Sequence, residues 1–148
     1  KKQAEQYIKD YFETYPKVKE YMDSLVEMGK SKGYVTSLYG RRRPIPELSA
    51  KNFMQRQFGE RIAMNSPIQG TAADIIKIAM NRVDARLRKE NMQSRLILQI
   101  HDELLVETKI EEIEEVSHIL NEEMIHAAAL KVPLIADVKQ GTTWYEAK

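Results

Sequence analysis

Three adjacent polar residues, His101, Asp102 and Glu103, interrupt the apolar stretch LILQIHDELLVE. Neighbouring residues of a strand point to opposite faces, so the two acids can address one ion only if the chain turns there. A hairpin turn would set both carboxylates side by side, where their repulsion favours a bound cation. Such oxygen ligands suit Mg²⁺ or Mn²⁺. The alternative is a turn without chemistry, because polar residues are common at hairpin ends.

A second group of polar residues follows a helical spacing. Arg61, Asn65 and Gln69 are four residues apart, so they share one face if a helix continues to Gln69. All three side chains can donate hydrogen bonds. The alternative is a solvent-exposed polar helix face that binds no partner. The group lies in a basic span, which favours phosphate contacts; the flanking basic residues are Arg41, Arg42, Arg43, Arg56 and Lys77.

Charge is unevenly distributed along the chain. Residues 1–95 hold 19 Lys and Arg against 11 Asp and Glu, whereas residues 96–148 hold 4 against 11, although the net charge is only +1. Segregation of this kind indicates a polyanionic partner for the first part, with a solvated helix face as the alternative.

Apolar residues recur with helical period in the first part of the chain. Residues 7–26 predict two helices, or one helix broken at Pro16, which end at Gly33. The stretch YVTSLYGRRRPIP predicts a short strand, a turn at Tyr39 and Gly40, and an irregular basic return. Residues 50–90 predict a long helix, kinked or interrupted between Pro67 and Gly70.

The second part predicts a small sheet and a helix. RLILQI and LLVE read as two strands joined by a tight turn, and a capping box from Thr108 to Glu111 begins a helix that runs to about Ala129. VPLIADV alternates as one more strand would. His118 and His126 lack metal-ligand spacing and are expected at the surface. The predicted class is α+β, with long helices and a small antiparallel sheet that carries a carboxylate-tipped hairpin.

Composition narrows the class of protein. The chain has 148 residues and no cysteine, which fits one compact unit in a reducing, cytoplasmic setting and excludes thiolate metal sites and a cysteine nucleophile. No stretch has the length of apolar sequence that a membrane span requires. The first residues, KKQAEQYIKDYF, are already in helical rhythm and include no initiator Met. We therefore expect a segment of a larger protein.

Three stretches together resemble a known family: GRRRPIPEL, ERIAMNSPIQGTAADIIKIAM and LILQIHDELLVE. In this order and at these separations they resemble the carboxyl-terminal part of family A DNA polymerases, and the likeness covers essentially the whole chain. It implies template-directed addition of deoxynucleotides to a primer 3′ end. The implied partners are primer-template DNA and deoxynucleoside triphosphates, with two Mg²⁺ ions, or Mn²⁺, in the complete enzyme. A monomer without membrane association is implied for the full-length enzyme.

The resemblance also implies residue roles. Asp102 is similar to a metal-binding carboxylate of the polymerase palm, Glu103 to its neighbouring acid, and His101 to a residue at the primer end. By the same resemblance Gln99 lies near the duplex, and the group of Arg61, Asn65 and Gln69 touches the minor groove at the primer terminus. Donors there suit the purine N3 and pyrimidine O2 acceptors of every correct pair.

The chain departs from the family pattern at two motifs. It lacks the strand motif D-x-S-x-x-E and the nucleotide-binding helix R-x-x-x-K-x-x-x-F-G, and neither Asp74 nor Asp137 replaces the missing aspartate. In the family both motifs lie upstream, so we expect the segment to be inactive alone. Residues 1–92 would form a helical fingers base with a DNA-facing helix, and residues 93–148 part of the palm. The alternatives are a non-catalytic duplex DNA-binding module and a metal-dependent phosphohydrolase.

Overall fold

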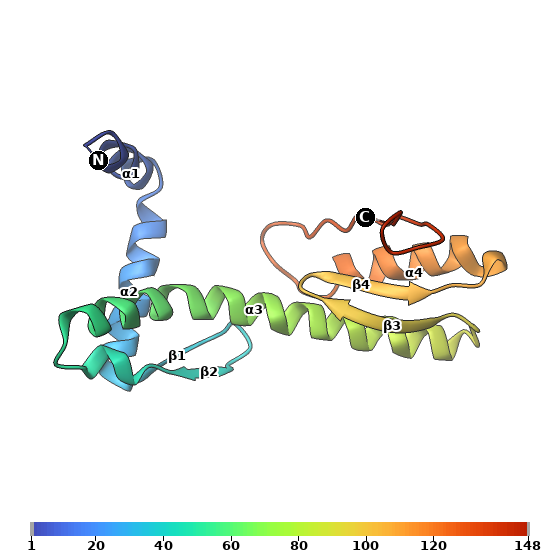
Figure 1. The fold of residues 1–148 in the computed structure, drawn as a ribbon, viewed down its shortest axis with the longest axis horizontal. Helices are drawn as coiled ribbons and strands as arrows, with labels where there is room; N and C mark the ends of the chain where they lie inside the picture. Colours follow the sequence, from blue (N-terminus) through green and yellow to red (C-terminus); the bar gives the residue numbers. More distant parts are fainter. Residues whose placement is uncertain (1, 148) are drawn as a thin grey trace. The chain divides into compact units, whose positions relative to one another are not determined.

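The computed structural model describes residues 2–147 and has the predicted α+β class (Figure 1). Its contacts divide the chain into two compact units, Lys1–Thr71 and Ala72–Lys148, and the long helix α3 (Phe53–Lys89) contributes residues to both.

Two helices open the first unit, as predicted. Helix α1 (Lys2–Thr14) is followed by Tyr15 and then by α2 (Pro16–Lys32), where the proline occupies the first helical turn and needs no N–H partner. Gly33 ends α2 in the left-handed conformation, with φ 77°, and its N–H donates to the carbonyl of Gly29. The break at Pro16 and the stop at Gly33 are both confirmed.

A short hairpin follows the helices. Strands β1 (Tyr34–Thr36) and β2 (Arg42–Pro44) pair antiparallel, with Val35 opposite Arg43. The predicted strand and turn are confirmed, but the basic return is a regular strand and not the irregular segment expected. A two-stranded sheet has only edge strands, and an edge strand tolerates a proline such as Pro44.

Two glycines, Gly29 and Gly59, allow Leu48 to pack closely in the core of the first unit. The 3₁₀ helix η1 (Pro46–Ser49) brings Leu48 against α2 and α3. A Cβ at Gly29 would lie 2.6 Å from Leu48 Cδ1, and a Cβ at Gly59 would lie 2.9 Å from the Leu48 backbone nitrogen. Burial of such a side chain contributes roughly 1.5–3 kcal/mol. The core of this unit is formed by Val35, Ile45, Leu48 and Ala63, with Val26 and Ile62 packed against it.

Helix α3 begins after a side-chain cap and runs without interruption. The Asn52 side-chain oxygen accepts from the backbone N–H groups of Met54 and Gln55, at 2.8 and 3.4 Å. The interruption expected between Pro67 and Gly70 does not occur. Tertiary contacts outweigh the local signal here, because Pro67 is buried on the same face as Gly59 and Ala63.

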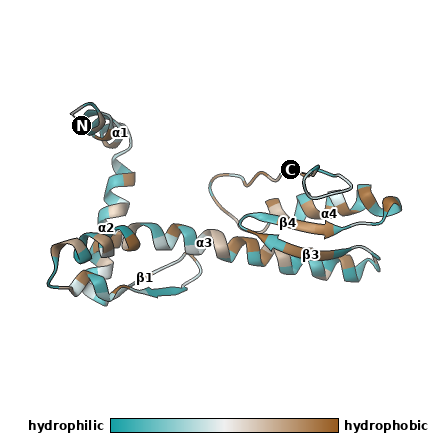
Figure 2. Ribbon diagram, in the orientation of Figure 1, coloured by the Kyte–Doolittle hydropathy of each residue, from teal (hydrophilic) through white to brown (hydrophobic). Residues whose placement is uncertain are grey.

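The second unit packs a hairpin and a helix on the end of α3. Strands β3 (Arg95–Ile100) and β4 (Glu103–Glu107) pair antiparallel, as predicted, with an irregularity in register between Leu96 and Leu98. Helix α4 (Ile113–Ile125) completes the unit, and Figure 2 shows hydrophobic colouring along the hairpin and α4. The core consists of Val83, Leu87, Val116 and Ile119, with Met92, Leu104, Val106 and Leu120 against it.

The entry to α4 differs from the predicted capping box. The Thr108 hydroxyl donates to the Val106 carbonyl at 3.3 Å, and a 3₁₀ turn, η2 (Ile110–Glu112), precedes the helix. The Glu112 carboxylate instead accepts from the backbone N–H groups of Gln93 and Ser94, at 3.0 and 2.9 Å. The capping-box prediction is wrong because α4 begins only at Ile113, after the 3₁₀ turn, and the Thr108 hydroxyl bonds to the Val106 carbonyl.

The predicted strand at residues 132–138 is also wrong. These residues run as coil, tied to α4 by the Asn121 side-chain amide, which donates to the Ala136 carbonyl at 2.7 Å. Alternation alone does not make a strand, because a strand needs a neighbour that takes its hydrogen bonds. Helix α4 ends at Ile125 and not near Ala129. No helix within residues 2–147 combines the length and apolar character needed to cross a membrane.

Candidate functional site

The polar interruption of the apolar stretch forms the turn of the β3–β4 hairpin. Ile100 pairs with Glu103, so His101 and Asp102 make up a two-residue loop. His101 has φ 52°, and Asp102 does not share the positive sign. A positive φ at the first position of a two-residue hairpin loop favours glycine there. A histidine there stores roughly 1–3 kcal/mol of backbone strain.

A side chain of β3 braces this turn. The Gln99 amide nitrogen donates to the His101 carbonyl at 2.7 Å. Because this hydrogen bond joins the strand to the strained residue, it fixes the direction in which the loop leaves β3. The structure therefore gives Gln99 a role inside the hairpin that sequence reasoning missed, while its contact with DNA stays a prediction.

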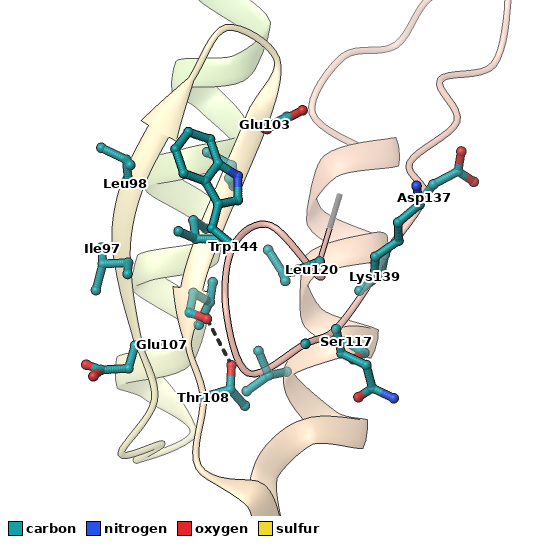
Figure 3. Close-up of a pocket in the computed structure, with 18 of the residues that line it drawn as sticks. Ile97, Leu98, Glu103, Glu107, Thr108, Ser117, Leu120, Asp137, Lys139 and Trp144 are labelled. Atoms are coloured by element: carbon teal, nitrogen blue, oxygen red, sulfur yellow. Dashed lines mark hydrogen bonds between the residues drawn. The ribbon is translucent and has the colours of Figure 1, made fainter.

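The hairpin turn exposes both acids and sets them on one groove. Asp102 and Glu103 are exposed, and both line a groove of about 1020 Å³ between the hairpin, α4 and the carboxyl-terminal segment. Figure 3 shows Glu103 at the hairpin end of this groove, with Asp137 and Lys139 on the carboxyl-terminal segment. Asp137 lines the same groove.

The acids fit a divalent cation in type but supply only part of its coordination. Carboxylate oxygens are the donors that Mg²⁺ takes, together with water and phosphate. Among residues 2–147, no three histidines, aspartates or glutamates gather closely enough to hold a metal ion. Asp137 therefore shares the groove without completing a metal site, and further ligands would have to come from outside these residues.

The helical group in the first unit has the arrangement expected from its spacing. Arg61, Asn65 and Gln69 are all exposed on α3, which continues past Gln69. The Arg61 guanidinium lies 5.8 Å from the centroid of the Phe58 ring, a distance at which the aromatic face attracts a cation. We call these three residues the polar row. The row and the hairpin acids belong to separate units.

The flanking arginines differ in exposure and in their surroundings. Arg41 and Arg42 are exposed, and the Arg42 guanidinium lies 4.9 Å from the centroid of the Tyr34 ring. Arg56 instead donates to the carbonyls of Ala50 and Lys51, at 3.0 and 2.7 Å, and so holds the loop before α3. Arg42 is therefore better placed than Arg56 to bind a phosphate group.

An ion-pair network that the sequence did not reveal joins α3 to α4. Arg86 donates to Glu122 and Glu123 on α4 and to Glu90. The hydrogen bond with Glu122 is the main cause that raises the pKa of Arg86, and the same bond lowers the pKa of Glu122. Only the pair with Glu90, four residues away, has a local sequence signal.

Comparisons with known proteins give the same family along almost the whole chain. Residues 1–146 match the family described as DNA polymerase family A. DNA polymerase I of Bacillus caldotenax and that of Bacillus subtilis are each 51% identical over 148 residues, which is all of this chain and 17% of each relative. The solved POL domain of Pol1 from M. smegmatis, in complex with DNA primer-template and dNTP, is 40% identical, with a TM-score of 0.94. That likeness covers 99% of this chain and 26% of the solved one.

Proposed function

Because this chain belongs to DNA polymerase family A, we propose that it acts as part of an enzyme that extends a DNA primer on a template. The observation that carries the proposal is the match along the whole chain to polymerases, one of them solved with DNA primer-template and dNTP. The chain spans only 17% of the length of the B. caldotenax relative. The proposed activity is therefore that of a longer polymerase that contains this segment.

We assign one part of a divalent metal site to the hairpin turn. Asp102 would ligate Mg²⁺, or Mn²⁺, and Glu103 would support the site as a neighbouring acid. The exposure of both carboxylates on one groove supports this assignment. Two bound ions supply charge stabilisation for the entering and leaving oxygens of phosphoryl transfer. The missing ligands would come from elsewhere in the polymerase.

The hairpin itself would hold these acids in place. The Gln99 hydrogen bond to His101 fixes the turn, and the ladder between β3 and β4 fixes the strand that carries Glu103. His101, exposed beside Asp102, would present its imidazole to the primer end. Gln99 would lie close to the same duplex.

The polar row would read the minor groove at the primer terminus. Its guanidinium and amide groups are exposed donors, and every correct base pair offers acceptors there irrespective of sequence. The row would thus test pair geometry. Arg41 and Arg42 would contact the phosphates nearby.

The remaining assignments concern the larger protein. Residues 1–92 would form the fingers base and residues 93–148 a palm segment. The enzyme would work in the cytoplasm as a monomer, apart from membranes.

Asp102→Asn, made in the full-length polymerase, tests the metal assignment. The neutral amide keeps the shape of the side chain but removes its charge, so nucleotide incorporation with Mg²⁺ should fall by about a thousandfold or more. Affinity for primer-template should change by less than about threefold, because Asp102 binds no phosphate directly. Single-turnover incorporation and DNA titration measure the two quantities.

Asp137→Asn is the matched control, since Asp137 lines the same groove without completing a metal site. It should incorporate nucleotides at the parent rate. Near-normal extension by Asp102→Asn would remove the metal assignment and leave a duplex DNA-binding module as the better description.

A further inference from the structure

The loop between β1 and β2 is a well-defined turn that exposes its tip. The Gly40 N–H donates to the Ser37 carbonyl at 3.0 Å, and Gly40 has φ 80°, whereas Leu38 and Tyr39 are not among the residues of positive φ. This is a type I turn closed by a left-handed glycine. Leu38 is 65% exposed. The loop thus makes no use of the Leu38 side chain in the core.

Two contacts fasten this loop to α3 beside the polar row. The Leu38 N–H donates to the Thr71 hydroxyl oxygen at 2.9 Å. A Cβ at Gly70 would meet the Ser37 Cβ at 3.4 Å, so the loop lies in van der Waals contact with the helix at that residue. Ser37 is itself buried, and its hydroxyl accepts from the Arg41 N–H at 3.2 Å.

The turn of α3 that receives the loop comes directly after a helical proline. Pro67 has no N–H, so the Ala63 carbonyl in the preceding turn lacks its usual helical donor. Gln69 lies between Pro67 and Thr71. The Thr71 hydroxyl donates to the Pro67 carbonyl at 2.6 Å while its oxygen accepts from the loop. One hydroxyl therefore spans the turn that carries Gln69 and ties this turn to the loop.

We propose that Thr71 is a positioning residue for Gln69. By fastening the loop to the turn of α3 that follows Pro67, its hydroxyl sets where the Gln69 amide meets the primer terminus, and it places Arg41 beside the same stretch of DNA. This inference rests on the proposed function of the polar row. It gives a role to the loop and to Thr71, which do not belong to the row.

Two pairs of variants in the full-length polymerase separate the hydroxyl from the rest of the contact. Thr71→Val removes the hydroxyl at nearly constant shape, and Thr71→Ser retains it. Leu38→Pro removes the donor N–H from the other side, at the turn position where proline is favoured. Leu38→Ala keeps that N–H and loses only the exposed side chain. The Leu38 pair keeps the test decisive if Thr71→Val is poorly folded.

The readout is the ratio of extension rates from matched and mismatched primer ends. Thr71→Val and Leu38→Pro should each lower this ratio about 3- to 10-fold, the effect expected from loss of one hydrogen bond. Thr71→Ser and Leu38→Ala should keep the parent ratio. The KM for deoxynucleoside triphosphate should stay unchanged in all four, because the row acts on the primer end and not on the nucleotide.

Gln69→Ala distinguishes the possible failures. If it lowers the ratio and adding Thr71→Val lowers it no further, the two residues act as one unit, as proposed. Additive effects, or an unchanged ratio in both Thr71→Val and Leu38→Pro, would overturn the positioning role while leaving the row intact. An unchanged ratio in Gln69→Ala would overturn the row and the positioning role together.

Discussion

At the scale of single residues, the hairpin turn combines a backbone constraint with an exposed histidine. His101 adopts φ 52° although its side chain packs into no core cluster. Strained residues of this kind gather at sites where an exact direction matters. Glycine would adopt this φ without strain, so the strain at position 101 is a consequence of the histidine side chain.

His101→Val and His101→Gly should therefore differ in stability. A β-branched residue tolerates positive φ poorly, so the valine variant should be less stable than the glycine variant by about 1 kcal/mol or more. Without backbone strain, valine at an exposed strand end would be neutral or better. Urea unfolding of the polymerase, followed by a probe in the palm, measures the difference. Equal midpoints for the two variants would show that the turn is unstrained.

At the scale of elements, one acid joins the start of β3 to the start of α4. The Glu112 carboxylate accepts hydrogen bonds from the Gln93 backbone N–H and the Ser94 hydroxyl. These bonds, the one from Gln93 most of all, lower the pKa of the Glu112 carboxyl from the usual 4.5. A carboxyl with a lowered folded pKa contributes stability above its unfolded value. That contribution is lost as the pH falls through the folded value.

The junction of β3 and α4 should accordingly loosen in acid. Amide hydrogen-exchange protection at Gln93 and Ser94 should decline as the pH falls below 4.5. Glu112→Gln should show weaker protection already at neutral pH, with little further change in acid. Glu111→Gln, an exposed neighbour, should behave as the parent protein does. An unaltered acid profile in Glu112→Gln would assign the loosening to another group.

Elements with strong local signals were predictable from the sequence. Pro16 and Gly33 bound α2 through backbone chemistry that acts within a few residues, and the hairpin of β3 and β4 follows from two apolar runs around a polar turn. The failures have a common cause. Glu112 at the entry to α4 bonds to Gln93 and Ser94, which lie 19 and 18 residues away in the chain. The segment at 132–138 lacks a neighbouring strand. The local sequence pattern indicates neither fact.

The positions of the proposed site residues on their elements were predictable from the sequence, but the contacts that hold these elements were not. Spacing alone placed Arg61, Asn65 and Gln69 on one exposed face of α3. Spacing could not show that Gln99 braces the turn, because this depends on a side chain reaching over the strand end. Nor could it show that Thr71 meets Leu38, 33 residues earlier in the chain.

At the scale of the whole molecule, the excess of basic residues in the first 95 positions suits a phosphate partner, and the acidic remainder does not. Arg42 is exposed on the basic hairpin, where its guanidinium stacks over Tyr34. Each protein cation that meets a phosphate releases counterions, so it contributes to the salt dependence of binding.

Arg42→Ala should therefore weaken primer-template binding to a similar degree for all sequences. The slope of log affinity against log salt should fall in magnitude by about one. Lys17→Ala is a suitable control, because Lys17 is exposed on α2 and already paired with Glu20 at 2.6 Å. Titrations of labelled DNA at several salt concentrations measure both slopes. A parallel salt dependence for Arg42→Ala and the parent would exclude a phosphate contact at Arg42.

The small buried face of α3 limits which substitutions this helix tolerates. Gly59, Ala63 and Pro67 alternate along the helix with the outward residues of the polar row. An added methyl group at Gly59 would collide with the backbone at Leu48. Packing therefore restricts residue 59 to glycine, whereas a substitution at the outward position Arg61, two residues along the helix, leaves this core undisturbed.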